Sequence, residues 1–250
     1  MNKEKIIVAL DVETAGEARE IIAELRGEVG AFKIGLQLFT AVGASFVREV
    51  VENNVKVFLD VKFHDIPNTV AKAAVEVARL GVWMFNVHAL GGGEMMRKTV
   101  ESVREICDKE NLKQPKIIGV TVLTSSDQET LREVGIETEI NTQVVNLAQL
   151  TAKCNLDGVV ASPNEIKAIR KVIGKKDFLI VTPGIRNQKT KNQEPKTKNQ
   201  FATKDDQKRV MTPGEAVSAG SDYLVIGRPI TQSENKIAAV REILREIETA

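Results

Sequence analysis

Short apolar runs alternate with longer amphipathic segments along the whole chain. The short runs are rich in β-branched residues, which favours strands, whereas the longer segments repeat apolar residues at helical spacing. The predicted strands are Ile6–Leu10, Ala31–Ile34, Val55–Asp60, Met84–His88, Ile117–Leu123, Gly158–Ala161, Phe178–Thr182 and Tyr223–Gly227. The predicted helices are Ala15–Leu25, Ser45–Asn53, Asn68–Leu80, Gly93–Asp108, Asn141–Lys153, Pro163–Ile173, Pro213–Ala219 and Glu234–Glu248.

Eight strand–helix units in a chain of 250 residues predict the α/β class, and specifically a single-domain (β/α)8 barrel over residues 1–250. Gly81 and Gly220 fall just after predicted helices, where a left-handed cap favours glycine. A doubly wound sheet also alternates strands and helices, but it would carry a glycine-rich turn after the first strand. Here Asp11-Val12-Glu13-Thr14 follows that strand instead.

The third predicted strand ends in charged residues. Successive side chains of a strand alternate between its faces, so Asp60 and Lys62 are expected to point the same way, with Val61 opposite. An unpaired carboxylate or ammonium group at the end of a buried strand would destabilise the fold by roughly several kcal/mol. The pair is therefore either a structural ion pair or part of a catalytic site, and this pattern alone is typical of both.

Polar residues also end most of the other predicted strands. In a barrel the reactive groups collect where the carboxyl ends of the strands open into loops. The residues found there, in chain order, are Asp11, Lys33, Asp60, Lys62, His88, Thr124, Ser125, Pro183, Gly184, Ile185, Arg186, Gly227 and Arg228. The loops after strands seven and eight often bind phosphate, and a glycine followed by an arginine suits an anion. Gly227 and Arg228 therefore predict a phosphorylated substrate.

Composition narrows the possible functions further. The chain has 35 basic and 34 acidic residues, a net charge of +1, which argues against a dedicated nucleic-acid or membrane surface. Aromatic residues make up only 4 %, so stacking platforms for single strands are not expected. The first apolar run is too short for a signal peptide, and Cys107 and Cys154 lack metal or redox spacing. We therefore expect a cytoplasmic enzyme.

The segment from Phe58 to Thr69 closely resembles the signature of the orotidine 5′-phosphate decarboxylase family. The resemblance continues through most of the chain, in the segments Ala9–Asp11, Phe32–Gly35, His88–Gly92, Val120–Ser125, Thr182–Arg186 and Ile226–Pro229. It implies a homodimeric barrel that converts orotidine 5′-monophosphate to UMP and CO₂ in pyrimidine biosynthesis. It also implies that neither a metal nor an organic cofactor is used.

The same resemblance implies a role for each matching residue. Lys62 would be the proton donor, flanked by Asp60 and Lys33, and Asp65 would enter from the partner subunit to complete an alternating row of charges. Such a row would stabilise a carbanion at C6 of the pyrimidine. The implied contacts to ribose are Asp11 and Lys33, with Asp65 and Thr69 reaching it across the dimer interface. Those to the pyrimidine are Thr124 and Ser125 at its edge, and Pro183, Ile185 and Ile66 of the partner subunit as an apolar wall around the ring. Those to phosphate are Arg186, Gly227, Arg228 and a glutamine.

Residues 187–209 depart from the family pattern. This stretch is long, polar and lysine-rich, and it contains Lys189-Thr190-Lys191-Asn192-Gln193 repeated as Lys196-Thr197-Lys198-Asn199-Gln200. The repeat lacks apolar positions for a coiled coil, so we interpret it as a disordered insertion in a surface loop rather than a nucleic-acid or partner contact. It leaves two candidates for the phosphate glutamine, Gln207 and Gln188, of which we prefer Gln207 because the family pattern resumes soon after it.

Two other functions compete with this interpretation. Some related barrels act on phosphosugars, such as hexulose-phosphate synthases and keto-gulonate-phosphate decarboxylases. They carry a similar Asp-x-Lys-x-x-Asp pattern but use a divalent metal. A non-catalytic barrel could also bind nucleotides as a sensor. The first would depend on Mg²⁺, and the second would bind UMP analogues without releasing CO₂.

Overall fold

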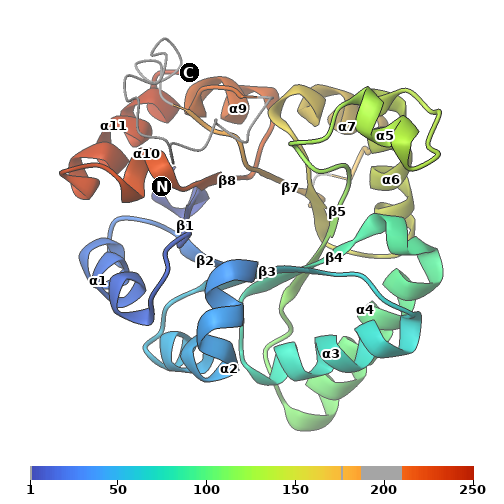
Figure 1. Cartoon of the computed structure of the whole chain (residues 1–250), viewed down its shortest axis with the longest axis horizontal. Coiled ribbons are helices and arrows are strands. Elements are labelled where there is room, and N and C mark those ends of the chain that lie inside the picture. The colour runs from blue at the N-terminus through green and yellow to red at the C-terminus, as the bar shows by residue number, and fades with distance from the viewer. Residues whose placement is uncertain (1, 176, 187–209) are drawn as a thin grey trace.

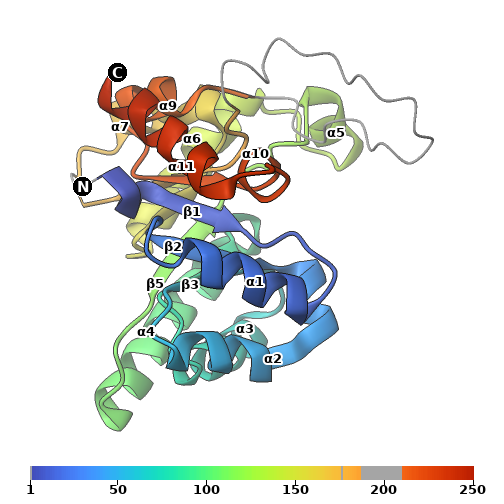
Figure 2. The same ribbon diagram turned by 90° about the vertical axis from the view of Figure 1, so that its left-hand side faces the viewer.

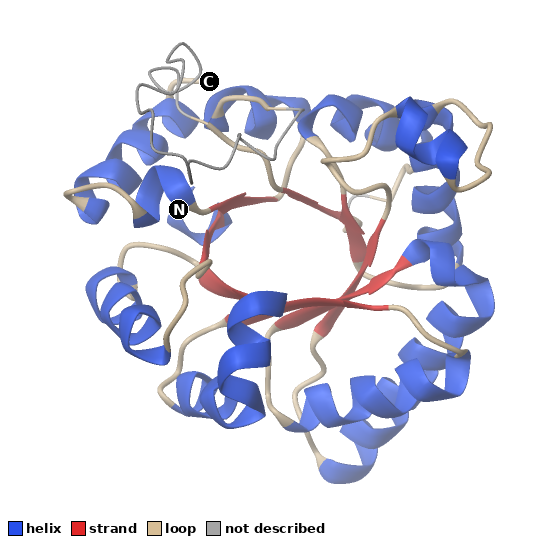
Figure 3. Ribbon diagram, viewed as in Figure 1, coloured by secondary structure: helices blue, strands red, loops and turns tan. Residues whose placement is uncertain are grey.

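The computed structural model describes residues 2–175, 177–186 and 210–250. Eight parallel strands follow one another around a closed barrel in chain order, and β8 pairs with β1 to close it (Figures 1 and 3). The (β/α)8 barrel predicted from the sequence is therefore confirmed. The strands are β1 (Ile6–Ala9), β2 (Ala31–Gly35), β3 (Val57–Phe63), β4 (Met84–His88), β5 (Lys116–Val120), β6 (Gly158–Val160), β7 (Leu179–Thr182) and β8 (Tyr223–Ile226).

Helices surround the ring of strands. They are α1 (Ala15–Leu25), α2 (Leu36–Glu52), α3 (Pro67–Arg79), α4 (Gly92–Glu110), α5 (Gln128–Glu133), α6 (Ile140–Lys153), α7 (Ile166–Val172), α9 (Pro213–Ala219), α10 (Arg228–Thr231) and α11 (Lys236–Glu248), with 3-10 turns η1 (Asn2–Lys5), η2 (Ala89–Gly91) and η3 (Pro163–Glu165). Local sequence explains their ends. Thr14 and Glu17 form a capping box at α1, and Gly220 takes the left-handed conformation after α9, as predicted.

Several boundaries differ from those predicted. Helix α2 begins at Leu36 rather than Ser45, because Gly43, with a φ of 70°, joins two helical segments across a kink. Strand β3 extends to Phe63, and β5 ends at Val120 rather than Leu123. The short helices α5 and α10 were not predicted, since so few residues carry no clear helical period.

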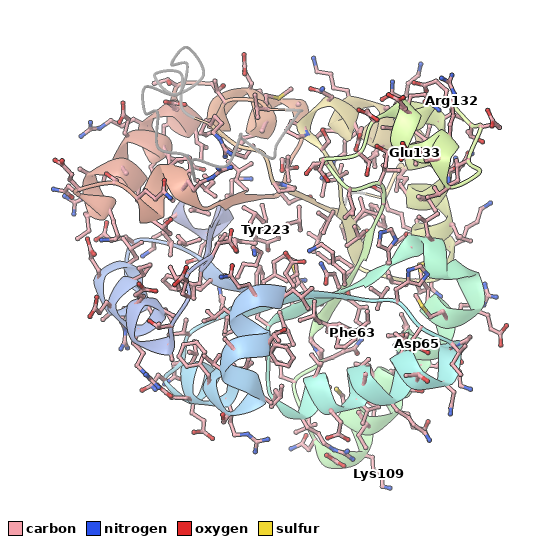
Figure 4. The ribbon with its side chains drawn as sticks, in the orientation of Figure 1. Phe63, Asp65, Lys109, Arg132, Glu133 and Tyr223 are labelled. Carbon is pink, nitrogen blue, oxygen red and sulfur yellow. The ribbon has the colours of Figure 1, made fainter. Side chains whose placement is uncertain are left out.

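The strands separate two apolar layers. Side chains that point into the barrel form a small cluster of Ile7, Ala9, Ala31, Phe58, Met84, Ile118, Val181 and Val225. The alternate side chains pack outward against the helices in the larger cluster, which includes Phe85 and Val87 of β4. At the amino-terminal end of the barrel, Trp83 packs edge-on against Tyr223, with ring centroids 5.1 Å apart. Tyr223 lies inside the ring of strands (Figure 4), so the interior is filled at that end.

The chain termini mark one end of the barrel. Both chain termini lie on the amino-terminal side, while β1 points toward the opposite side, where α5 lies (Figure 2). Within the described part of the chain, no helix is long and apolar enough to cross a membrane. The predicted insertion, residues 187–209, lies outside the described residues.

Candidate active site

A cavity of about 300 Å³ opens at the carboxyl ends of the strands. Eleven of the residues predicted from the sequence line this one cavity, namely Asp11, Lys33, Asp60, Lys62, Thr124, Ser125, Pro183, Gly184, Arg186, Gly227 and Arg228. They come from loops or strand ends at six of the eight strands (β1, β2, β3, β5, β7 and β8). Residues far apart in sequence thus meet at one site because the closed parallel sheet gathers the carboxyl ends of its strands.

Four of these residues form a charged row of alternating sign within one chain. The ammonium nitrogen Nζ of Lys33 lies 3.0 Å from Asp11 Oδ1 and 3.5 Å from Asp60 Oδ2. The Nζ of Lys62 lies 2.7 Å from Asp60 Oδ1. The Lys33 and Asp60 side chains are only 10 % and 13 % exposed, whereas that of Lys62 is 37 % exposed. Lys62 is therefore the cation of the row that is best placed to meet a ligand in the cavity.

A glycine leaves room for the row. Gly35 ends β2, and a Cβ atom at this position would lie 2.8 Å from Lys33 Nζ and 3.5 Å from Asp11 Oδ1. A side chain at this position would require the Lys33 ammonium group to shift. Gly35 thus leaves the space in which the Lys33 side chain turns toward β1.

The two buried members of the row, Lys33 and Asp60, keep their charges. Burial lowers the pKa of Lys33, but attraction to Asp60 and Asp11 outweighs it, so the net pKa is raised above the usual lysine value. Burial likewise raises the pKa of Asp60, but Lys33, Lys62 and hydrogen bonds from Lys62 and Asn86 outweigh it and lower the net pKa. At neutral pH the centre of the row is therefore a preformed pair of opposite charges, arranged before any ligand arrives.

Apolar side chains form the floor beneath this row. Phe58 lines the cavity just below Asp60 on β3, and Val120, Val160 and Val225 line it from β5, β6 and β8. Water is replaced there by hydrocarbon, so the field of the nearby ammonium group is screened less than in solution. The arrangement can therefore stabilise a negative charge that develops beside Lys62.

The comparisons with known proteins agree with this geometry. The family model described as "Orotidine 5'-phosphate decarboxylase / HUMPS family" matches residues 4–243. The chain belongs to this family. A protein named orotidine 5'-phosphate decarboxylase from Syntrophotalea carbinolica is 51 % identical over 248 residues, covering 99 % of this chain and 96 % of the relative. Its counterpart from Geobacter metallireducens is 52 % identical over 247 residues, covering 98 % and 96 %.

A solved structure shares the fold as well as the family. The crystal structure of orotidine 5'-phosphate decarboxylase from Lactobacillus acidophilus superposes with a TM-score of 0.81 at 34 % sequence identity. The match covers 97 % of this chain and 98 % of that one. A single barrel of this family therefore accounts for nearly the whole sequence.

The family signature on β3 does not lie on a regular strand. Leu59 pairs with Phe85 and Phe63 with Val87, so Asp60, Val61 and Lys62 stand opposite Asn86 alone. Lys62 has a φ of 52°, in the left-handed region that lysine rarely adopts. Asp60 and Lys62 both line the cavity while Val61 packs against the outer apolar layer, so the predicted alternation of faces is confirmed. A bulge interrupts the pairing of β3 with β4 at this point, and it is there that Lys62 takes its left-handed conformation.

Asn86 is the residue of this site that the sequence analysis missed. It is fully buried, its Nδ2 donates to Asp60 Oδ1 at 2.7 Å, and its Oδ1 accepts from the backbone N–H of Lys62 at 2.8 Å. One signal could have revealed it, since an asparagine in the apolar run Met-Phe-Asn-Val-His needs a partner when buried.

Four predicted contacts do not line the cavity. Ile185 is fully buried in the outer apolar layer, so its predicted place in the wall around the ring is not seen, and Pro183 takes the inward position instead. Asp65, Ile66 and Thr69 are exposed at the start of α3, and Asp65 lies outside the ring of strands (Figure 4). Their contact with a partner's site stays a prediction. Gln207 and Gln188 lie outside the described residues.

His88 ends β4 next to the charged row but does not line the cavity. Its ring stacks on His64 with centroids 5.3 Å apart, and its Nδ1 accepts from the N–H of Leu90. Burial, and then the nearby charges of His64 and Lys62, lower the pKa of His88 to about 4. His88 is therefore neutral at pH 7 and adds no positive charge to the row.

Proposed function

We propose that the charged row carries out the reaction of orotidine 5′-phosphate decarboxylases, the conversion of orotidine 5′-monophosphate to UMP and CO₂ in pyrimidine biosynthesis. Membership of the family and relatives of that name at about half identity over nearly the whole chain support this activity. The observation that carries the mechanism is the Lys62 ammonium group, held 2.7 Å from Asp60 at the mouth of an apolar-floored cavity.

The chemistry explains why a fixed cation is needed. When CO₂ leaves, the bond between C6 and the carboxylate carbon breaks, and its electron pair remains on C6 in the plane of the ring. No neighbouring group can delocalise that pair. A Lys62 ammonium group beside C6 would stabilise the developing charge and then transfer one proton to carbon, giving UMP. The neutral amine of Lys62 would recover its proton from water after the product leaves.

Asp60 and Lys33 support Lys62 in this proposal. The Asp60 carboxylate accepts from Lys62 on one oxygen and attracts Lys33 with the other, so the Lys62 side chain is oriented before substrate binds. In water, solvent dipoles must reorient around the developing charge. A preorganised site avoids that cost, which is usually the largest contribution to the rate enhancement.

The opposite wall of the cavity suits the phosphate group of the substrate. Arg186 follows β7, and Gly227 and Arg228 follow β8, so two guanidinium groups border the cavity at the position where barrels of this kind often hold phosphate. Thr124 and Ser125, after β5, would bond the pyrimidine edge, and Pro183 would pack on the ring. Asp11 and Lys33 would then bond the ribose between these two ends.

Replacing Arg228 with alanine should weaken phosphorylated ligands far more than the bare nucleoside. A charge-assisted contact to phosphate is lost in the first case only, so the dissociation constant of UMP should rise by roughly 10- to 100-fold while that of uridine changes little. Calorimetric titration of both ligands measures the difference. Arg241→Ala is a suitable control, since this exposed arginine of α11 pairs with Glu28 in the turn after α1. Equal losses for UMP and uridine would refute the phosphate role.

We also propose that the active form is a homodimer in which Asp65, Ile66 and Thr69 reach the partner's cavity. Leu36, Ile66 and Leu90 are large apolar residues that are 61 %, 67 % and 42 % exposed. They follow β2, β3 and β4, three neighbouring strands, on the same side of the barrel as the cavity. A second copy covering this face would remove them from water and bring Asp65 to the end of the charged row.

A single assay tests the proposed activity against the phosphosugar rival. We expect the ultraviolet absorbance of orotidine monophosphate to fall when enzyme is added, at the same rate with and without EDTA. The row supplies the required positive charge from lysines, so chelation should have no effect. Turnover of ketose phosphates only, and only with Mg²⁺, would overturn the proposal, as would binding of UMP without release of CO₂.

A further inference from the structure

We propose that Asn86 is a positioning residue for the reaction, because it fixes Lys62 and Asp60 in the relative orientation that the chemistry requires. This inference rests on the proposed role of Lys62. Asn86 lies in the middle of β4, is fully buried and does not line the cavity. It would therefore act on the substrate only through its two neighbours on β3.

The backbone of β3 shows what Asn86 replaces. Between the pairs Leu59–Phe85 and Phe63–Val87, three residues of β3 face one residue of β4. In a regular parallel ladder the N–H of Lys62 would bond a backbone carbonyl of its neighbour. The bulge moves it out of register, and the side-chain oxygen Oδ1 of Asn86 accepts that N–H at 2.8 Å instead.

The same amide group also holds the carboxylate. Its Nδ2 donates to Asp60 Oδ1 at 2.7 Å, the oxygen that also accepts from Lys62 Nζ at 2.7 Å. One side chain thus joins the backbone of the lysine to the side chain of the aspartate. The left-handed φ of 52° at Lys62 is unfavourable for a lysine, so it persists only where neighbouring contacts enforce it.

The chemistry of the two partners selects an amide at this position. The N–H of Lys62 can only donate and the ionised carboxylate of Asp60 can only accept, so the residue between them needs one acceptor and one donor. Asparagine offers both without a charge. Leucine of similar size offers neither, and an ionised aspartate would offer only acceptors and a second negative charge.

The first test replaces Asn86 with leucine. We expect kcat to fall roughly 10- to 100-fold, which is the usual effect of removing a residue that orients a group acting directly at a site. The affinity for UMP should stay nearly unchanged. Thr121→Val is the matched control. Its fully buried hydroxyl donates to the Val160 carbonyl at 3.0 Å and does not contact the row, so its loss should change stability but not kcat. Thermal melting of each variant shows whether it folds.

The second test, Asn86→Asp, uses the pH dependence of kcat to ask whether a hydrogen-bond donor to Asp60 is required. The new carboxyl group would stand beside Asp60, and two adjacent carboxylates share a proton with an apparent pKa above the ordinary aspartate range. When protonated, the group can accept from Lys62 and donate to Asp60, as the amide does. The ratio of its kcat to that of the wild type should therefore rise as pH falls from about 8 to 5.

The other ionisable groups around Asn86 are Lys62 on β3, Lys33 on β2, and His88 on β4 with its stacked neighbour His64. All are present in the wild type too, so taking the ratio of the two enzymes at each pH removes their contribution. A purely structural role for Asn86 would lower stability in both variants but would give a ratio that does not depend on pH.

Each outcome decides the proposal. A folded Asn86→Leu protein with kcat near the wild-type value overturns it, and so does an Asn86→Asp ratio that stays flat with pH. Should the leucine variant fail to fold, the aspartate variant alone decides. Failure of the proposed role of Lys62 would show differently, as an active Lys62→Ala enzyme in an otherwise unchanged chain.

Discussion

Replacing Lys62 with alanine should reduce kcat for orotidine monophosphate by roughly a thousandfold or more, which is the upper end of what losing one stabilising donor costs. Lys62 is the group assigned both to stabilise the carbanion and to supply its proton, so no remaining residue can replace it. The decrease in substrate absorbance under saturating conditions measures the effect. Near wild-type turnover in this variant would remove Lys62 from the mechanism.

The fold should survive this substitution. Alanine bears about the same left-handed backbone cost as lysine at this position, roughly 1 kcal/mol, so the bulge gains no new strain. Asp60 keeps Lys33 and Asn86 as partners, so its charge is not left unpaired. Lys56→Ala is a matched control, because this exposed lysine pairs with Glu4 at 2.9 Å at the far end of the barrel. It should leave kcat unchanged.

Mixing two inactive proteins should restore activity if the site is shared between subunits. A hybrid dimer of Lys62→Ala and Asp65→Ala subunits contains one cavity with both an intact Lys62 and an intact Asp65 from its partner. Random exchange in a two-fold dimer makes half of the dimers hybrids, so about a quarter of all cavities should become active. Each protein alone should stay near background, which makes the recovered activity easy to detect.

The control for this experiment is a mixture of Lys62→Ala with the double variant that also lacks Asp65. That mixture has no intact cavity in any pairing, so it should stay inactive. Subunit exchange is verified independently with two differently tagged proteins. If exchange is complete and the first mixture remains inactive, Asp65 does not cross an interface to complete the row.

Much of the fold could be predicted because its signals are local. The eight apolar runs and the glycine caps at Gly81 and Gly220 depend on neighbouring residues only, and each lies at or near the position that the sequence indicated. The residues at the strand ends also predicted most of the polar lining of the cavity. Parallel topology brings those ends together regardless of their distance in the chain.

The unpredicted parts depend on contacts between strands. At the bulge of β3, Asn86 on β4 accepts the backbone N–H of Lys62, and no pattern within β3 shows this contact. Ile185 was expected to line the cavity because the family resemblance implied it, yet its side chain packs in the outer apolar layer. The faces that residues present after a strand ends follow the turn rather than the strand period, so alternation could not decide them.

The left-handed backbone at Lys62 also bears on how this enzyme could be engineered. Glycine would adopt that conformation without strain, so a library screened for thermostability alone would be drawn toward glycine and away from activity. A designer who grafts these charges onto another barrel would likewise have to graft the three-against-one register and the buried amide as one unit.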